Sequence, residues 1–169
     1  PFGFDKSKRY PVLLTQYSGP GSQSVRNRWS LDWEDALPHE GYIVACCDGR
    51  GTGFRGEKFK KCTYADLGRR EVEDQISFAR FLARQEFVDA ERIGIYGWSF
   101  GGFMALNCAL HGEGLFRMAI AVAPVTSWRY YDTIYTEIYN GLPQDNPKGY
   151  DDNSPLSHAE KLSERTKLL

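Results

Sequence analysis

The chain has 169 residues, 41% of them apolar and 25% charged, and its formal net charge at pH 7 is −1. This composition excludes disordered and fibrous proteins, and the length suits one domain with a sizeable core. Lys and Arg form no stripe, and no apolar run approaches the roughly 20 residues that span a bilayer. We therefore predict no nucleic-acid partner and find no sign of a membrane segment.

Four cysteines are present: Cys46, Cys47, Cys62 and Cys108. Their spacing contains no C-x-x-C pair, and no histidine-rich stretch accompanies them, so we predict neither a metal site nor a cofactor. Free cysteine behaves as a small hydrophobic residue, which favours buried free thiols at these positions. A disulfide pair remains an alternative.

The first half of the chain alternates strand and helix patterns. A run at residues 11–17 is typical of a strand, and Ser18-Gly19-Pro20-Gly21 closes it as a turn. The next predicted elements are a helical stretch at residues 29–40 broken near Pro38, a strand at residues 42–47, and an amphipathic helix at residues 71–84.

The second half continues this alternation. Its predicted elements are a strand at residues 92–96, a helix at 103–110 that is apolar on nearly every side, a strand at 116–123, helical stretches at 130–139 and 155–164, and an apolar run that starts at residue 167. Strands that alternate with helices indicate an α/β fold, with a mostly parallel sheet and helices on both faces. No linker or repeat divides the chain, so we expect one domain that is incomplete at its C-terminus.

The sequence Gly97-Trp98-Ser99-Phe100-Gly101 fits the nucleophile-elbow pattern G-x-S-x-G. A predicted strand ends just before it and an apolar helix begins just after it, which is the context that the pattern requires. In such a turn the two backbones pass so closely that only glycine fits on either side of the serine. The helix N-terminus then points free N–H groups at a developing oxyanion. The alternative is a Gly/Ser turn that merely connects strand and helix.

From Tyr10 to Leu169 the sequence resembles the hydrolase domain of the prolyl oligopeptidase family, and most closely its dipeptidyl peptidase IV branch. The resemblance is carried by residues 4–8, 17–23, 48–53, 71–75, 87–89, 97–102, 123–125 and 128–137. It implies an α/β-hydrolase fold and a serine exopeptidase. Such an enzyme cleaves short N-terminal peptides after proline or alanine, through an acyl-enzyme on Ser99.

The resemblance also implies roles for individual residues. Ser99 would be the catalytic nucleophile, and the backbone N–H of Phe100 with the hydroxyl of Tyr17 would form the oxyanion hole. The pocket for the residue before the scissile bond would be lined by Phe100, Val125, Trp128, Tyr131 and Tyr135. Position 100 commonly holds Tyr in the family, so a hydroxyl is missing from this pocket wall.

Other parts of such an enzyme are not found in this sequence. The resemblance implies an N-terminal β-propeller with a glutamate pair for the substrate's amine, and a C-terminal portion with the triad Asp and His. We therefore expect residues 1–169 alone to be inactive. The resemblance leaves a homodimer of the full-length protein open, and it suggests a periplasmic or extracytoplasmic location.

Several residues have structural interpretations beside functional ones. Asp151 or Asp152 followed by His158 has the order of a hydrolase triad, but only six or seven residues separate acid from base, with no strand between them. We therefore reject that pair. Similar structural interpretations apply to His39, to His111, to Arg50 as a turn residue, and to Glu71, Glu73 and Asp74 at a helix N-terminus.

Tyrosines at helical spacing between residues 128 and 139 can also be core residues rather than a pocket. Two functional alternatives stay open beside the exopeptidase: a broader peptidase or esterase of the same fold, and a non-catalytic binding protein with a hydrolase shell. The intact Ser99 favours an enzyme over the binding protein.

Overall fold

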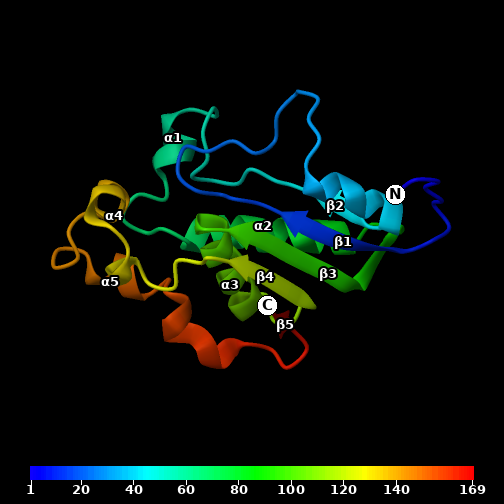
Figure 1. Ribbon diagram of the computed structural model, residues 1–169. Helices are drawn as coiled ribbons and strands as arrows, with labels where there is room; N and C mark the ends of the chain where they lie inside the picture. The colour runs from blue at the N-terminus through cyan, green and yellow to red at the C-terminus, as the bar shows by residue number, and fades with distance from the viewer.

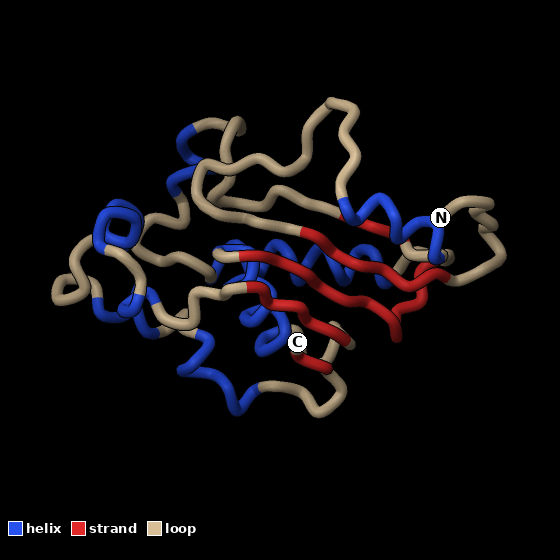
Figure 2. The backbone as a smooth tube through the Cα atoms, in the orientation of Figure 1, coloured by secondary structure: helices blue, strands red, loops and turns tan.

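A computed structural model describes residues 1–169, and its centre is a five-stranded parallel sheet (Figures 1 and 2). The strand order is β2-β1-β3-β4-β5. The strands are β1 (Tyr10–Thr15), β2 (Ile43–Ala45), β3 (Val88–Trp98), β4 (Met118–Val122) and β5 (Lys167–Leu168). All five coincide with strands or apolar runs that the sequence predicts.

Two long helices, α2 (Arg69–Ala83) and α3 (Phe100–His111), pack against each other on one face of the sheet. Helix α2 lies in the crossover from β2 to β3, and α3 lies in the crossover from β3 to β4. These crossovers run in the same direction across the sheet, and right-handed crossovers that run in one direction place their helices on one face. The short 3₁₀ helix η1 (Trp33–Glu40) follows the opposite crossover from β1 to β2. The Trp33 ring packs edge-on against Tyr96 at 4.8 Å, on the face opposite Ile95.

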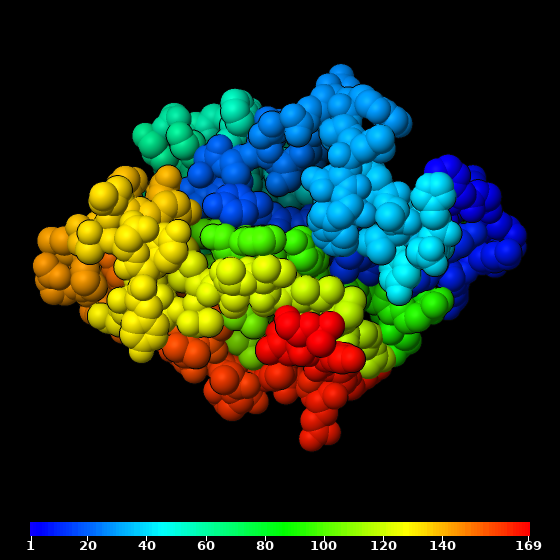
Figure 3. Space-filling view, in the orientation of Figure 1, coloured from blue at the N-terminus to red at the C-terminus, as the bar shows by residue number.

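Short helices surround the carboxyl end of the sheet. They are α1 (Glu57–Lys61), η2 (Trp128–Tyr130), α4 (Thr133–Asn140), α5 (Pro147–Asp151) and η3 (Pro155–Lys161). The yellow segment with η2 and α4 forms one end of the molecule, opposite the blue N-terminus (Figure 3).

The structure changes the bounds of three predicted helical stretches; that at residues 155–164 is the 3₁₀ helix η3, which ends at Lys161. Residues 29–32 lie outside η1. The helix begins at Trp33, and Asp32 caps it by accepting a hydrogen bond from the Trp33 N–H at 2.7 Å. The stretch 130–139 is not one helix, because Tyr131 is extended and Asp132 starts α4 by accepting from the Tyr135 N–H at 2.7 Å. The short helices α1 and α5 were not predicted, since five residues are too few to show a helical period.

The core lies between the sheet and the pair α2 and α3, where 21 buried residues form one cluster. Ten of the residues of α3 are buried, as its apolar sequence predicts. All four cysteines are free thiols. Cys108 is fully buried, whereas Cys46, Cys47 and Cys62 are only half-buried. No helix has both the length and the apolar character needed to cross a membrane.

Candidate active site

Ser99 is the single residue between the end of β3 and the start of α3. Its backbone has φ 57° and ψ −115°, a conformation that a side chain disfavours. The Ser99 N–H donates to the carbonyl of Val122 at 2.9 Å, and the Ser99 carbonyl accepts from the Phe103 N–H at 3.0 Å. Contacts to β4 and α3 thus hold the strained turn in place, and the half-buried Ser99 lines a cavity at the end of the sheet.

Three glycines allow the close approach of backbones around Ser99. A Cβ at Gly101 would lie 2.6 Å from the carbonyl oxygen of Gln16, and one at Gly102 would lie 2.9 Å from that of Val122. A Cβ at Gly97 would overlap the carbonyl of Gly101. The crowding that the G-x-S-x-G pattern predicts is therefore present on both sides of the serine.

The sheet topology brings Tyr17 to the same place. β1 and β3 are neighbours, with Thr15 opposite Tyr96, so the ends of both strands meet at one edge. After β1 the chain turns to β2 on one side, and after β3 it turns to β4 on the other. Such a switch point opens a crevice at the carboxyl ends of the strands, where α/β proteins bind ligands.

A small cavity of about 20 Å³ lies at this point. The residues that line it are Tyr17, Ser99, Phe100, Val125, Trp128, Tyr131 and Tyr135. The structure therefore brings together every site residue that the resemblance implies. Their individual roles stay predictions.

The cavity walls are aromatic rings in mutual contact. Trp128 is 1% exposed, and its ring stacks on Tyr135 at 6.0 Å between centroids and lies 5.6 Å from Phe100. Tyr131 meets Tyr135 edge-on at 5.5 Å. Trp128 belongs to the core cluster and also lines the cavity. Such a packed box resists deformation and offers flat apolar faces.

Two tyrosines at the cavity, Tyr17 and Tyr135, have raised pKa values. Burial raises the pKa of the Tyr17 phenol, and the neighbouring Tyr131 adds to the rise, while a hydrogen bond with Tyr135 opposes it. Burial also raises the pKa of Tyr135, with a further contribution from Tyr17. At neutral pH the Tyr17 hydroxyl is thus available as a hydrogen-bond donor.

A second donor comes from the helix that follows the serine. Phe100 is the first residue of α3, and the first N–H groups of a helix have no acceptor within it. This N–H sits at the positive end of the helix dipole, beside Ser99. The hydroxyl of Tyr17 and the N–H of Phe100 are the kinds of donor that stabilise an oxyanion.

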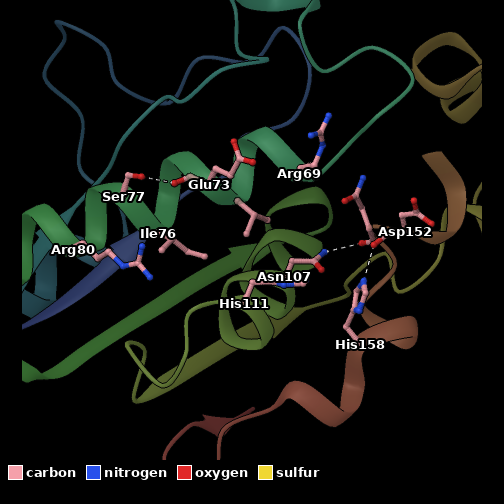
Figure 4. Close-up of a pocket in the computed structure, with 12 residues that line it drawn as sticks. Arg69, Glu73, Ile76, Ser77, Arg80, Asn107, His111, Asp152 and His158 are labelled. Atoms are coloured by element: carbon pink, nitrogen blue, oxygen red, sulfur yellow. Dashed lines mark hydrogen bonds between the residues drawn. The ribbon is translucent and has the colours of Figure 1, made fainter. Parts of the chain in front are cut away.

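No histidine lines this cavity. His158 and His111 meet edge-on at 5.0 Å in a separate cleft of about 530 Å³ between α2, α3 and η3 (Figure 4). There the Nε2 atom of His158 lies 2.6 Å from the backbone carbonyl of Asp152, not from its carboxylate. His39 stacks on Phe2 with centroids 3.9 Å apart. The geometry agrees with the structural interpretation of all three histidines.

The acidic residues at the start of α2 hold neighbouring loops through direct hydrogen bonds and ion pairs, rather than mainly through an interaction with the helix dipole. Asp74 accepts from the Arg50 backbone N–H at 2.7 Å and from the Arg50 guanidinium at 2.7 and 3.0 Å, and Glu73 accepts from the same side chain at 3.0 Å. Glu71 is buried, and its carboxylate accepts from the Gly68 N–H at 3.0 Å. Burial raises the pKa of Glu71 to about 8.

The sequence interpretation missed one buried polar group near the site, made of Gln16, Ser18 and Gln75. A signal for it exists, because Gln75 lies three residues after Val72 and four before Ala79, on the apolar face of its helix. A polar residue on such a face is expected to find a hydrogen-bond partner inside the protein.

Comparisons with known proteins agree with this geometry. The profile of the prolyl oligopeptidase family matches residues 29–169. A probable dipeptidyl-aminopeptidase B from Trichophyton verrucosum is 46% identical over the whole chain, which covers 19% of that relative. The counterpart from Podospora anserina is 47% identical over the whole chain, with 18% of the relative covered.

Two solved structures share the fold. Dipeptidyl peptidase 4 from Porphyromonas gingivalis superposes with a TM-score of 0.96 at 50% identity, over 99% of this chain and 24% of that one. A putative dipeptidyl aminopeptidase IV from Bacteroides ovatus gives 0.94 at 36% identity, with 99% and 24% covered. The chain thus spans about a fifth to a quarter of the length of these relatives. It belongs to the prolyl oligopeptidase family, in its dipeptidyl peptidase IV-like branch, and forms part of a serine peptidase domain of the dipeptidyl aminopeptidase type.

Proposed function

We propose that the protein containing this segment is an aminopeptidase that removes short N-terminal peptides after proline or alanine. The observation that carries the proposal is the strained Ser99 at the switch point, facing the same cavity as the Tyr17 phenol. A serine held this way is exposed to attack a carbonyl, and a donor across the cavity suits the charge that the attack creates.

The chemistry follows from these positions. Ser99 Oγ attacks the carbonyl carbon of the scissile bond and loses its proton to a general base. The oxygen that becomes negative accepts hydrogen bonds from the Phe100 N–H and the Tyr17 hydroxyl. The C–N bond then breaks, the leaving amine takes the proton from the base, and water hydrolyses the acyl-enzyme in a second round.

We place the general base and its acid partner outside residues 1–169. A serine hydroxyl is a weak nucleophile until a base takes its proton, and none of the three histidines lines the Ser99 cavity. The relatives that match are about five times longer than this segment, which leaves room for an acid, a base and a domain that binds the substrate's amine.

The aromatic box supports the choice of substrate. A cavity without a charged residue in its lining disfavours charged side chains, because burying an unpaired charge is strongly unfavourable. Aromatic lining residues such as Tyr131 and Tyr135 suit a compact apolar group such as a proline ring or an alanine methyl group. The substrate is then a peptide with proline or alanine before the scissile bond.

The experiment is covalent labelling of the full-length protein. A fluorophosphonate probe followed by peptide mapping is expected to place the adduct on Ser99, and Ser99→Ala is expected to abolish both labelling and peptide hydrolysis. Ser77→Ala is the matched control, since Ser77 is an exposed serine of α2 whose hydroxyl only donates to the Glu73 carbonyl. Labelling that survives in Ser99→Ala would refute the assignment.

A further inference from the structure

Tyr17 lies between two side chains that point into the protein. Gln16 is 7% exposed and Ser18 is 2% exposed, whereas Tyr17 itself is 38% exposed. Tyr17 is thus the one exposed side chain of the three, and it lines the cavity at Ser99. The neighbours are polar, and buried polar groups need partners.

Their partners come from three separate elements. Ser18 Oγ donates to Gln16 Oε1 at 3.0 Å, and Gln16 Nε2 donates to the Gly101 carbonyl at 2.9 Å. Gln75 Nε2, from α2, donates to Ser18 Oγ at 3.2 Å and to the Cys47 carbonyl after β2 at 2.8 Å. We name Gln16, Ser18 and Gln75 the glutamine bridge.

The bridge connects the loop that carries Tyr17 directly to the elbow that carries Ser99. Its elbow contact is the carbonyl of Gly101, two residues after the nucleophile, and the Gln16 carbonyl itself lies against Gly101. Ser18 has φ 64°, a left-handed conformation that costs energy for a residue with a side chain. Hydrogen bonds on both sides of the Ser18 hydroxyl hold that conformation.

We propose that Gln16, Ser18 and Gln75 are positioning residues that fix the Tyr17 phenol relative to Ser99. This inference rests on the proposed function, because it assigns the bridge a task only if Tyr17 stabilises the oxyanion. The bridge sets the distance between the Tyr17 hydroxyl and the carbonyl oxygen that becomes negative in the reaction. None of the three bridge residues lines the cavity itself.

Changes to the glutamine bridge and changes to the cavity lining are therefore expected to affect different kinetic constants. Loss of the bridge lets the Tyr17 loop shift, and shifts of about 1 Å can cost 10²-fold in rate. Removing one neutral hydrogen-bonding amide corresponds to about a tenfold loss of kcat. KM is expected to change less than twofold, since the residues that contact the substrate side chain are untouched.

The experiment uses the full-length protein with a prolyl chromogenic substrate, and kcat is expressed per fluorophosphonate-labelled site to correct for misfolded molecules. Gln75→Met keeps the volume of the side chain and removes its amide, and Ser18→Ala removes only the hydroxyl. Gln85→Met is the matched control, since its amide donates only to the Phe81 carbonyl on the surface of the same helix. We expect Gln75→Met and Ser18→Ala to lose about tenfold in kcat, with Gln85→Met unchanged.

The decisive measurement is a double-mutant cycle with Tyr17→Phe. If the bridge acts through the phenol, Gln75→Met is expected to cause no further loss of kcat in the Tyr17→Phe background. An equal loss in both backgrounds would overturn the inference and make Gln75 a merely structural residue. If Tyr17→Phe alone keeps full kcat, the oxyanion assignment fails first, which is a different pattern from failure of the bridge.

Discussion

Tyr17 and Ser99 approach each other because each is the first functional residue after a central strand. Tyr17 follows β1 and Ser99 follows β3, and the two strands pair directly. The side chain of Tyr17 folds over Gly19, where a Cβ would lie 3.0 Å from the Tyr17 Cζ atom. Gly19 therefore leaves room for the Tyr17 ring on one side, where any larger residue would collide with it.

Replacing this phenol tests its role. In the full-length enzyme, Tyr17→Phe removes one oxyanion donor and keeps the ring, so kcat is expected to fall by about 10²–10³. KM is expected to change little, because the donor acts on the transition state. Steady-state kinetics on a prolyl substrate measure both constants, and near wild-type turnover would mean that the ring is only packing.

These residues differ in how far sequence alone can identify them. Ser99 is marked by its glycines and its strand–helix context, and Tyr17 by family resemblance at the end of a strand. The contact of Gln16 with Gly101 joins residues 85 positions apart, and no local pattern encodes such a pair. The position of Gln75 on an apolar helix face predicts that its amide has a hydrogen-bond partner inside the protein, but it does not identify that partner.

At the scale of elements, the break between η2 and α4 shapes the pocket. The extended Tyr131 and the cap at Asp132 replace a continuous helix, so Tyr131 and Tyr135 both turn toward Trp128. Sequence periodicity predicts one helix here, since the aromatic residues keep a helical spacing across the break. The sequence signal for the break is Asp132, since an aspartate often caps the start of a helix.

Substrate selectivity tests this pocket. Chromogenic peptides with proline or alanine before the leaving group are expected to exceed those with lysine or aspartate by at least about 100-fold in kcat/KM, since a charge would be buried without a partner. Trp128→Ala is expected to reduce this difference in kcat/KM, because it removes a large ring from the lining of the pocket. A full-length enzyme that prefers charged residues at this position would contradict the pocket.

Helix α2 carries a second testable feature, the buried Glu71. Its folded pKa of about 8 lies well above that of an exposed carboxyl, so the folded state binds the proton more tightly than the unfolded state. The stabilisation is complete below the unfolded pKa of about 4 and is lost as pH rises toward the folded value. Stability is therefore expected to fall between about pH 5 and pH 8.

Glu71→Gln isolates this effect. The amide keeps an oxygen for the Gly68 N–H and cannot ionise, so the variant is expected to lose less stability between pH 5 and pH 8 than the wild type, by more than about 1 kcal/mol. Urea unfolding of the full-length protein at the two pH values measures the difference. Parallel pH profiles for both proteins would show that Glu71 does not titrate in this range.

For the molecule as a whole, the sequence predicts the sheet better than its surroundings. Apolar runs next to turn residues mark the positions of all five strands, although β2 is only half-buried and β5 is exposed. The arrangement of the helices depends on crossover direction, which only the strand order reveals. The sequence could therefore predict an α/β fold with helices on both faces, but not that α2 and α3 share one face while η1 lies on the other.

Residues 1–169 expressed alone are expected to show no peptidase turnover. The proposed nucleophile and the two proposed oxyanion donors are present, but no histidine lines the cavity to take the serine proton. Assays of the segment and the full-length protein side by side with a prolyl substrate measure this difference. Turnover comparable to the full-length protein would return Asp152 and His158 as a candidate acid and base.

Direct pairing of β1 with β3 also makes the site insensitive to chain length between the two strands. The segment between Thr15 and Val88 leaves the sheet at one central strand and returns to it at the neighbouring central strand. An insertion at the exposed stretch around Trp29 lengthens this segment without moving either strand. Each doubling of loop length costs only about 0.6 kcal/mol. Evolution can therefore remodel the surface above the crevice here, by adding or deleting residues, while Tyr17 and Ser99 keep their separation.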